Sequence, residues 1–191
     1  MPTKDERRIE AEKHVALMKA FFEAETKGSV ESSVIYEDGE GRELDIPPAR
    51  FDATRTDVTS DDAVSAVFGL SGKVAVLDPA TFTRPAAGYL NGSFSQEDQL
   101  CAESNLYSIL AGLEKSYHAK NKDYYRGGLY TDRALFIPKV KFSHSGVAKD
   151  VDVIAVAAPN RTRALERNRA AIEGICQVEG VMVDTGGGVR S

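Results

Sequence analysis

The amino-acid sequence predicts an α/β fold in which a mixed, mostly parallel sheet lies between helices. Two continuous apolar runs, Val74–Leu77 and Val151–Val156, are typical of strands buried on both faces, so we expect them to be inner strands. Stretches with helical spacing follow such runs, as where Leu106, Leu110 and Leu113 fall on one face. Buried strands that alternate with amphipathic helices indicate a layered α/β sheet.

The N-terminal part of the chain has patterns for a helix and a hairpin. Apolar side chains recur among charges with helical spacing over Asp5–Glu23, and Gly28 is expected to mark the end of this helix. The strand-like runs Val34–Tyr36 and Leu44–Ile46 flank a glycine-containing turn, which predicts a β-hairpin. The other elements expected are a helix at Asp61–Phe68 with Thr59 or Ser60 as its N-cap, a helix from Ser95 to about Lys115, a strand at Ala134–Ile137 stopped by Pro138, a helix at Arg161–Cys176, and a strand at Val181–Val183 before the loop Gly186–Gly188.

The composition limits the classes of function. The 191 residues are 42% hydrophobic and 28% charged, which fits one globular domain. A net charge of −5 provides no general attraction to nucleic acid or to an anionic membrane. No apolar run approaches the roughly 20 residues of a membrane helix, and the charged N-terminus lacks the apolar centre of a signal peptide. We therefore expect a cytoplasmic monomer that binds neither membranes nor, directly, nucleic acid.

Cysteine and histidine residues give no sign of a metal site. Cys101 and Cys176 lack the spacing of metal ligands and are expected to be reduced core thiols. The three histidines are scattered, and the glycine run near the C-terminus lacks the Lys-Ser/Thr of a P-loop. We expect no metal and no cofactor. Residues 117–130 mix cations with tyrosines, so this segment is either a cover for a nucleotide or, more simply, a solvated loop.

Residues 74–101 carry the pattern with the most chemical content. The segment runs from a strand through a loop of small residues to the expected start of a helix. Ligands of α/β sheets bind outside the carboxyl ends of strands, where such loops lie. The small residues Ala86, Ala87 and Gly88 would allow a ligand to approach the backbone closely. The segment therefore predicts a binding site.

Two adjacent acids, Glu97 and Asp98, stand at the start of the expected helix. Paired carboxylates at a ligand site can act as hydrogen-bond acceptor and as general acid/base. The alternative is structural, because Ser95 followed three residues later by Asp98 resembles a capping box. From spacing alone, capping is the favoured interpretation.

The segment as a whole resembles the microbial-type poly(ADP-ribose) glycohydrolases. That family has a strand of the type Val-Leu-Asn-Phe-Ala-Asn, a Gly-Gly-Gly run, and then Gln-Glu-Glu before Leu-Cys. The corresponding stretches here are Val76–Thr81, Pro85–Gly92 and Gln96–Cys101, followed by Ser104–Tyr107, Tyr130–Phe136 with Pro138, Val151–Ile154 and Ala158–Asn160. Their order and spacing agree with the family from about Ala11 to Arg169.

The resemblance implies a three-layer α/β/α, macrodomain-like fold for residues 1–191, with 1–50 as an N-terminal helix and hairpin extension and 51–191 as the core. It implies hydrolysis of the ribose–ribose glycosidic bonds of poly(ADP-ribose), with ADP-ribose, poly(ADP-ribose) or an ADP-ribosylated protein as the partner. The residues implied to be catalytic are Asp98, at the position of the family's catalytic acid, and Glu97 beside it. The residues implied to bind substrate are Asp78, Thr81, Ala86, Ala87, Gly88 and Gln96.

The sequence departs from the family pattern at functional positions. Ala86 and Ala87 replace two of the three glycines, and their methyl groups are expected to crowd a ribose. Asp98 replaces Glu, and the ribose-contacting Asn falls at Thr81. Thr185–Val189 is the one counterpart of the glycine-rich loop that wraps the diphosphate. These departures have three explanations: the chain is truncated, it is a degenerate relative, or it is a member with changed specificity. Three functions are therefore expected as alternatives: a weakly active hydrolase, a catalytically inactive module that binds ADP-ribose or another nucleotide, or a remnant that binds nothing.

Overall fold

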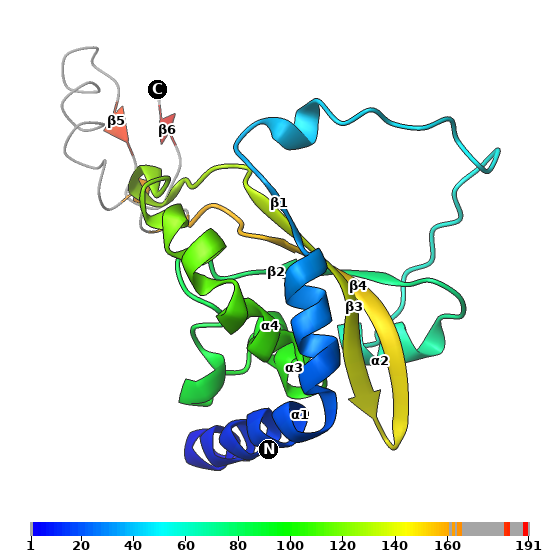
Figure 1. Ribbon diagram of the computed structural model, residues 1–191. Coiled ribbons are helices and arrows are strands. Elements are labelled where there is room, and N and C mark those ends of the chain that lie inside the picture. The colour runs from blue at the N-terminus through cyan, green and yellow to red at the C-terminus, as the bar shows by residue number, and fades with distance from the viewer. Residues whose placement is uncertain (1, 161, 163, 166–181, 184–188, 191) are drawn as a thin grey trace. The chain divides into compact units, whose positions relative to one another are not determined.

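A four-stranded mixed sheet packed by helices forms the main part of the chain in the computed structural model, which describes residues 2–160, 162, 164, 165, 182, 183, 189 and 190 (Figure 1). The helices are α1 (Lys4–Ser32), α2 (Ala63–Gly69), α3 (Gln96–Ala102) and α4 (Leu106–Gly112). The strands are β1 (Val34–Tyr36), β2 (Ala75–Pro79), β3 (Ala134–His144), β4 (Val147–Val156), β5 (Met182–Val183) and β6 (Val189–Arg190). Short 3₁₀ segments are η1 (Glu40–Arg42), η2 (Tyr89–Asn91), η4 (Lys120–Lys122) and η5 (Arg126–Gly128), and η3 (Glu114–His118) is a π-helical turn.

The sheet has the strand order β1-β3-β4-β2 and is mostly antiparallel. β1 and β4 both run antiparallel to β3, while β2 runs parallel to β4. The expected mostly parallel sheet is therefore wrong. β3 and β4 are antiparallel because a tight turn connects them, in which Ser145 and Gly146 both have positive φ, at 50° and 81°. Two such residues make the tight hairpin turn that joins antiparallel strands, whereas parallel strands need a long crossover.

One of the two apolar runs lies inside the described sheet and the other lies at its edge. β4, which contains Val151–Val156, has β3 on one side and β2 on the other, so its prediction as an inner strand is confirmed. The same prediction for Val74–Leu77 is wrong, because β2 ends the strand order of the described sheet and Leu77 is 60% exposed. A run of apolar residues does not distinguish a strand with two neighbours from a strand with one.

Pro138 does not end its strand, contrary to expectation. β3 continues to His144, and its register against β4 shifts between Ile137 and Val140. A β-bulge tolerates proline because the missing N–H is not needed in the ladder there. Within the bulge Lys139 has a φ of 56°, and its N–H donates to the side chain of Asp152 at 3.0 Å. The proline therefore marks a bend in a long strand.

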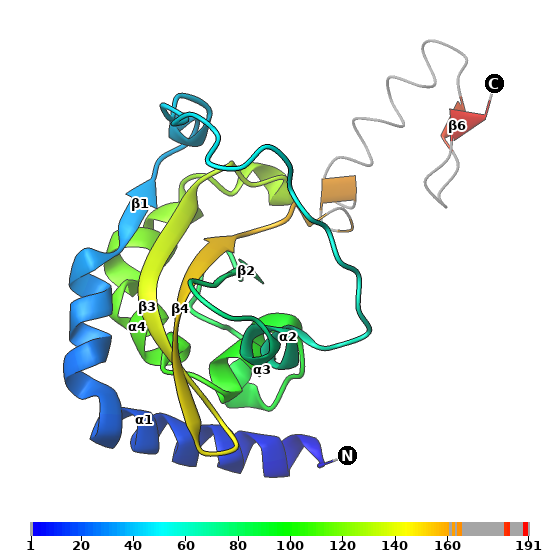
Figure 2. The ribbon, with the colours of Figure 1, turned by 90° about the vertical axis from the view of Figure 1, so that its right-hand side faces the viewer.

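Helix α1 is longer than predicted and passes through Gly28 to Ser32. It is kinked at Phe22, whose φ and ψ of −130° and 31° are not helical, and Figure 2 shows its two halves meeting at an angle. Its N-terminus has a capping box between Thr3 and Glu6. Across the described residues, no helix combines the length and the apolar character needed to cross a bilayer.

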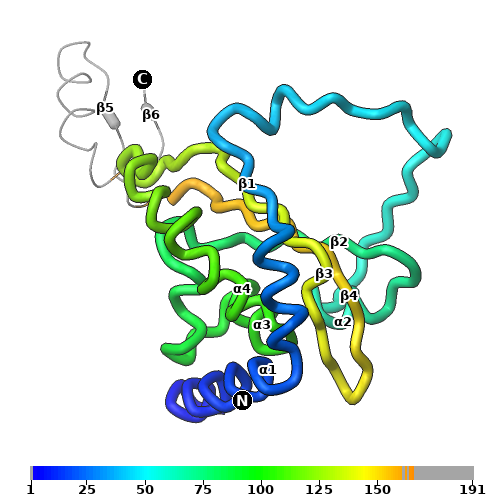
Figure 3. Tube along the Cα trace, viewed as in Figure 1, coloured from blue at the N-terminus to red at the C-terminus, as the bar shows by residue number. Residues whose placement is uncertain are grey.

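The predicted hairpin is wrong, because β1 pairs with β3 and not with Leu44–Ile46. Residues 43–62 instead form a long exposed excursion, which is cyan in Figure 3. Its large apolar side chains are uncovered, with Ile46 85% and Phe51 81% exposed. The glycine-containing turn after Tyr36 did not determine the pairing of β1, because its partner strand lies about a hundred residues later in the chain.

The helices that follow also differ in detail from the prediction. Asp62 is the N-cap of α2, in place of Thr59 or Ser60. The single helix expected over 95–115 is divided into α3 and α4, because Asn105 pairs with β3 and so interrupts the helix. The Asn105 N–H donates to the Lys141 carbonyl at 3.1 Å, and the Asn105 side chain accepts from the Lys141 N–H at 2.9 Å. β5 falls within the strand expected at Val181–Val183. The predicted helix over 161–176 and the glycine loop at 186–188 lie almost entirely outside the described residues.

The core lies on one face of the sheet. Cross-strand neighbours Leu135 and Ala155, and Ile137 and Val153, are completely buried. Residues of α3 and α4 join them in one cluster, so these helices cover this face. Side chains directly opposite in register point to the same face. Asp78 is the register partner of Ala155, and the sheet therefore directs a carboxyl group into the core.

Two compact units divide the chain. The first is formed by Met1–Lys122 with Asp132–Ala157, and it contains the sheet and the core. The second comprises Asp123–Thr131 and Ala158–Ser191. Within the second unit, the Asn160 N–H donates to the Gly128 carbonyl at 2.7 Å, the rings of Tyr125 and Tyr130 lie 5.5 Å apart, and β5 pairs antiparallel with β6.

The start of α1 is held against the segment that follows η2. The Arg7 side chain donates to the Gly92 carbonyl at 2.8 Å, and its guanidinium lies over the ring of Phe94 at 5.8 Å. Gly92 has a φ of 70°, and a Cβ there would overlap the carbonyl oxygen of Lys4. Glycine is thus required at Gly92 for both its backbone conformation and its close contact with α1.

This contact predicts that Gly92→Ala destabilises the fold more than the matched change Gly72→Ala. Gly72 has a similar φ of 78° but has open space around the position of a Cβ. We expect Gly72→Ala to lower the free energy of unfolding by about 1 kcal/mol through backbone strain alone. Gly92→Ala should lower it by about 1–3 kcal/mol more, because α1 must move. Urea denaturation followed by circular dichroism measures both, and equal losses would show that the α1 contact is unimportant.

Candidate functional site

Asp78 lies at the carboxyl end of β2 with its side chain fully buried. Neither of its carboxyl oxygens has a hydrogen-bond partner among the described residues. Burial, and then the negative charges of Glu97 and Asp98, raise the pKa of Asp78 to about 8. At neutral pH the carboxyl is therefore mostly protonated, and it can donate a hydrogen bond as well as accept one.

Glu97 ties the start of α3 to the loop after β2. The side chain is 3% exposed and accepts two hydrogen bonds from Thr81, one from the backbone N–H at 3.0 Å and one from the hydroxyl at 2.5 Å. Burial raises the pKa of Glu97, although the bonds from Thr81 act in the opposite direction. Both carboxylate oxygens of Glu97 are therefore already occupied by Thr81.

Asp98 has one carboxylate oxygen engaged and one free. Its Oδ2 accepts from the Ser95 N–H at 2.8 Å and from the Ser95 hydroxyl at 2.7 Å, and Ser95 Oγ accepts from the Asp98 N–H at 3.3 Å. The predicted capping box is therefore confirmed. Oδ1 is buried and has no partner in the described part of the chain. Capping thus uses half of the carboxylate and leaves the other half for different chemistry.

The loop between β2 and α3 approaches Asp98 at Gly88. A Cβ added to Gly88 would lie 2.7 Å from Ser93 Cβ and 3.1 Å from Asp98 Oδ1, so glycine leaves the space next to the free oxygen. Ala86 has a φ of 32°, a conformation that favours glycine, and its methyl group is packed in the core. Ala87, by contrast, is half-buried.

The structure brings several of the predicted site residues together. Glu97 and Asp98 lie close enough to Asp78 to raise its pKa, and burial, followed by the charges of all three acids, raises the pKa of the Cys101 thiol. Cys101 is a buried free thiol as predicted, whereas Cys176 lies outside the described residues. Four other predicted residues are joined to these less directly: Thr81 and the backbone of Ala86 through Glu97, Gly88 through Asp98, and Gln96 through a 3.2 Å bond from its side chain to the Leu77 carbonyl. Ala87 bonds within its own loop, where its carbonyl accepts from Asn91.

A cavity of about 470 Å³ opens beside α3. Of the predicted site residues, Asp98 alone lines it, and side chains of α1 and α2 such as His14 and Ser65 form other walls. His14 accepts or donates a hydrogen bond at 2.9 Å with the Tyr89 hydroxyl, and burial lowers the pKa of His14. That the predicted residues all line one cleft therefore stays a prediction. Within the described residues, no group of three or more His, Cys, Asp or Glu side chains is arranged to hold a metal ion.

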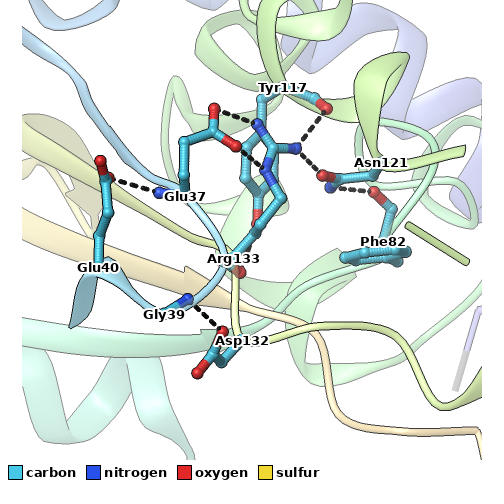
Figure 4. A network of polar contacts seen from close by, with 8 residues as sticks. All are labelled: Glu37, Gly39, Glu40, Phe82, Tyr117, Asn121, Asp132 and Arg133. Carbon is cyan, nitrogen blue, oxygen red and sulfur yellow. Dashed lines mark hydrogen bonds and ion pairs between the residues drawn. The ribbon is translucent and has the colours of Figure 1, made fainter. Parts of the chain in front are cut away.

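Sequence reasoning missed the residues that support the loop from behind. Phe82, next to Thr81, is held through its carbonyl by Asn121, and Asn121 is held by the buried Arg133 (Figure 4). The segment containing Asn121 was expected to be a solvated loop or a nucleotide cover, yet His118 and Asn121 are fully buried. A signal was present in Arg133, a charged residue directly before the apolar run that opens β3, because an arginine buried there needs polar partners.

A family model described as the microbial-type PARG catalytic domain matches residues 6–144 of this chain. No curated protein matches it. The match covers the site residues together with β1, β2, α3 and α4.

Solved structures of two bacterial poly(ADP-ribose) glycohydrolases are similar to this fold. The enzyme from Thermomonospora curvata is 21% identical with a TM-score of 0.72, and the match covers 92% of this chain and 77% of that one. A further structure of that protein contains the inhibitor ADP-HPD. The enzyme from Deinococcus radiodurans in complex with ADP-ribose is 25% identical with a TM-score of 0.63, and the match covers 76% of this chain and 62% of that one.

The raised pKa of Asp78 predicts that the fold loses stability as the pH rises from about 4 to about 8. Over this range the folded state holds a proton that the unfolded state releases, so the loss approaches about 1.4 kcal/mol per pH unit. Asp78→Asn removes the titrating group and should flatten this slope. Urea denaturation at pH 5, 6.5 and 8 measures it.

The exposed residue Asp52 offers a control, and Asp52→Asn should keep the slope of the unmodified protein. If Asp78→Asn also keeps that slope, Asp78 is not the group that holds the proton.

Proposed function

The chain belongs to the microbial-type PARG catalytic domain family, and on that premise we propose that it binds ADP-ribose and hydrolyses ribose–ribose glycosidic bonds of poly(ADP-ribose), free or attached to protein. The observation that carries this proposal is the free Oδ1 of Asp98, a buried carboxyl oxygen beside a glycine at the start of α3. Family members of known structure bind ADP-ribose or the inhibitor ADP-HPD, which supports the ligand class.

Asp98 is proposed as the general acid and base. In the first step, the bond between the anomeric carbon and the leaving ribose oxygen breaks while Asp98 Oδ1 gives its proton to that oxygen. In the second step, a water molecule attacks the oxocarbenium-like carbon and returns a proton to Asp98. The hydrogen bonds from Ser95 hold Oδ2, so the carboxyl group is oriented for proton transfer through Oδ1.

Glu97, Thr81 and Asp78 are proposed to bind and orient the ribose. Glu97 holds Thr81 through two hydrogen bonds and so fixes the place where this segment would meet the sugar. Asp78 stands where the family pattern has Asn. Because its pKa is about 8, it is mostly neutral at physiological pH, and in that form it can donate and accept hydrogen bonds, as an amide does. Gly88 and Ala87 are proposed to lie against the ribose, with Gln96 and Ala86 fixing the loop from its two ends.

The proposed activity is slow. Asp98 is one methylene shorter than the Glu of the family pattern, and a misplacement of about 1 Å can cost a hundredfold in rate. The methyl group of the half-buried Ala87 takes space where the family pattern has glycine. The capping box favours a second function, a catalytically inactive ADP-ribose-binding module, because it explains Asp98 without chemistry. We further propose a monomeric, cytoplasmic protein in which residues 1–191 act as one macrodomain-like, three-layer domain.

Asp98→Asn is expected to lower the release of ADP-ribose from poly(ADP-ribose) by at least about 100-fold, because the amide cannot give up a proton. Its oxygen can still accept from Ser95, so ADP-ribose binding by calorimetry should change by less than about threefold. The exposed Glu114 gives a control, since Glu114→Gln should leave both quantities unchanged. Equal release by the unmodified protein and Asp98→Asn would exclude Asp98 as the acid, and no binding at millimolar ADP-ribose would exclude both functions.

Asp98→Glu is expected to raise the rate tenfold or more, which corresponds to about 1.4 kcal/mol of transition-state stabilisation. Glu is the usual residue of a capping box, so the helix start should tolerate it. Chromatography of released ADP-ribose measures the gain. If the rate stays the same while ADP-ribose still binds, the defect lies in the alanine-substituted loop.

A further inference from the structure

Two buried side chains, Asn121 and His118, contact the carbonyl oxygen of Phe82. Asn121 donates to it through Nδ2 at 2.7 Å, and His118 Nδ1 lies 3.4 Å from the same oxygen. Phe82 is 3% exposed, and both partners are fully buried. Phe82 directly follows Thr81, whose N–H and hydroxyl hold Glu97. The contact therefore fixes the backbone one residue away from the proposed ribose-binding pair.

The orientation of the Asn121 amide is imposed by Arg133. A guanidinium has only hydrogen-bond donors, so the amide must turn its oxygen toward it. Arg133 Nη1 donates to Asn121 Oδ1, which leaves the amide nitrogen directed at the Phe82 carbonyl (Figure 4). The direction of the second hydrogen bond thus follows from the first.

Arg133 is itself held in place by Glu37 and Tyr117. It is fully buried and pairs with Glu37 through two bonds, from Nε at 2.7 Å and from Nη2 at 2.9 Å. Its guanidinium lies over the ring of Tyr117 at 5.2 Å, and the Tyr117 hydroxyl donates to the Arg133 carbonyl at 3.1 Å. A buried cation without its counter-ion is costly, so this arrangement resists rotation of the guanidinium.

We infer that Asn121, oriented by Arg133, is a positioning residue that holds the Thr81–Phe82 backbone and, through it, the carboxylate of Glu97. The inference rests on the proposed function, because it assigns Asn121 a part in binding ADP-ribose. Because Asn121 is fully buried, we assign it no contact with the ligand or the reacting atoms. It acts from behind the loop, whereas Asp98 is held by its own helix through Ser95. Loss of the Asn121 contact should therefore weaken binding and leave the proton-transfer step largely intact.

Asn121→Asp breaks one of the two links selectively. The carboxylate keeps an acceptor for Arg133, and it loses the donor that Phe82 requires. Asn105→Asp is the matched control, because Asn105 is also buried and uses both ends of its amide, donating to the Thr26 hydroxyl at 2.8 Å and accepting from the Lys141 N–H at 2.9 Å. Both variants introduce a carboxylate at a fully buried position, but only Asn121→Asp changes a side chain that contacts the Thr81–Phe82 segment.

The first measurement needs no ligand. Amide hydrogen exchange of a peptide covering residues 80–88 should become about tenfold faster in Asn121→Asp and stay unchanged in Asn105→Asp, because loss of one hydrogen bond frees the Thr81 segment. Unchanged exchange of this peptide in Asn121→Asp would overturn the inference. So would an equal increase in Asn105→Asp, since the effect would then be general destabilisation.

The second measurement separates binding from chemistry. In Asn121→Asp we expect the Kd for ADP-ribose and the KM for poly(ADP-ribose) to rise about tenfold, with kcat reduced by less than about threefold, which is the pattern of lost uniform binding. A reduced kcat with unchanged Kd would contradict a positioning role in binding. If the unmodified protein fails to bind ADP-ribose, the proposed function fails, and the exchange experiment still decides whether Asn121 holds the loop.

Discussion

Carboxyl groups that are buried with no ion-pair partner among the described residues are the constraint around which the end of β2 and the start of α3 are built. Asp78, Glu97 and Asp98 are each at most 3% exposed. An ionised carboxylate buried in this way lowers the stability of the fold by roughly several kcal/mol unless other groups compensate its charge. The three carboxyls are compensated in three ways: a retained proton on Asp78, two bonds from Thr81 to Glu97, and the capping serine beside Asp98. Their different environments give three chemically distinct groups within one turn of helix and one strand end.

A buried cation is compensated on the other side of the same loop, and by other means. Arg133 neutralises its charge with Glu37, whose side chain is 45% exposed and so remains partly hydrated. The pKa of Glu37 is lowered, first by its hydrogen bonds from Arg133. The loop containing Thr81 and Phe82 thus lies between an acidic cluster and a basic anchor, and hydrogen bonds tie it to both. A loop segment held from two sides is a better platform for a ligand than one that is held from neither.

Local signals in the sequence were sufficient for part of this arrangement. The capping box at Ser95 and the apolar run of β4 depend on neighbouring residues, and both are present as predicted. The pairing of β1 with β3, the edge position of β2 and the break between α3 and α4 depend on contacts between distant segments, and the predictions failed there. Asn105 shows the reason: its helix breaks to satisfy a strand that begins about thirty residues later. Asp78 was predicted as a site residue, yet its retained proton follows from burial, which no single-sequence pattern shows.

The difference between the alanines and the glycine of the loop has a consequence for how this sequence can change over generations. Ala86 directs its methyl into the core, so a substitution there alters packing and leaves the space around Asp98 intact. Gly88 has no such freedom, because any side chain would meet Ser93 and the free oxygen of Asp98. The two ends of the triple-glycine pattern are therefore not equivalent. Alanine at position 86 is compatible with the space around Asp98, whereas position 88 must remain glycine for as long as Asp98 keeps its place.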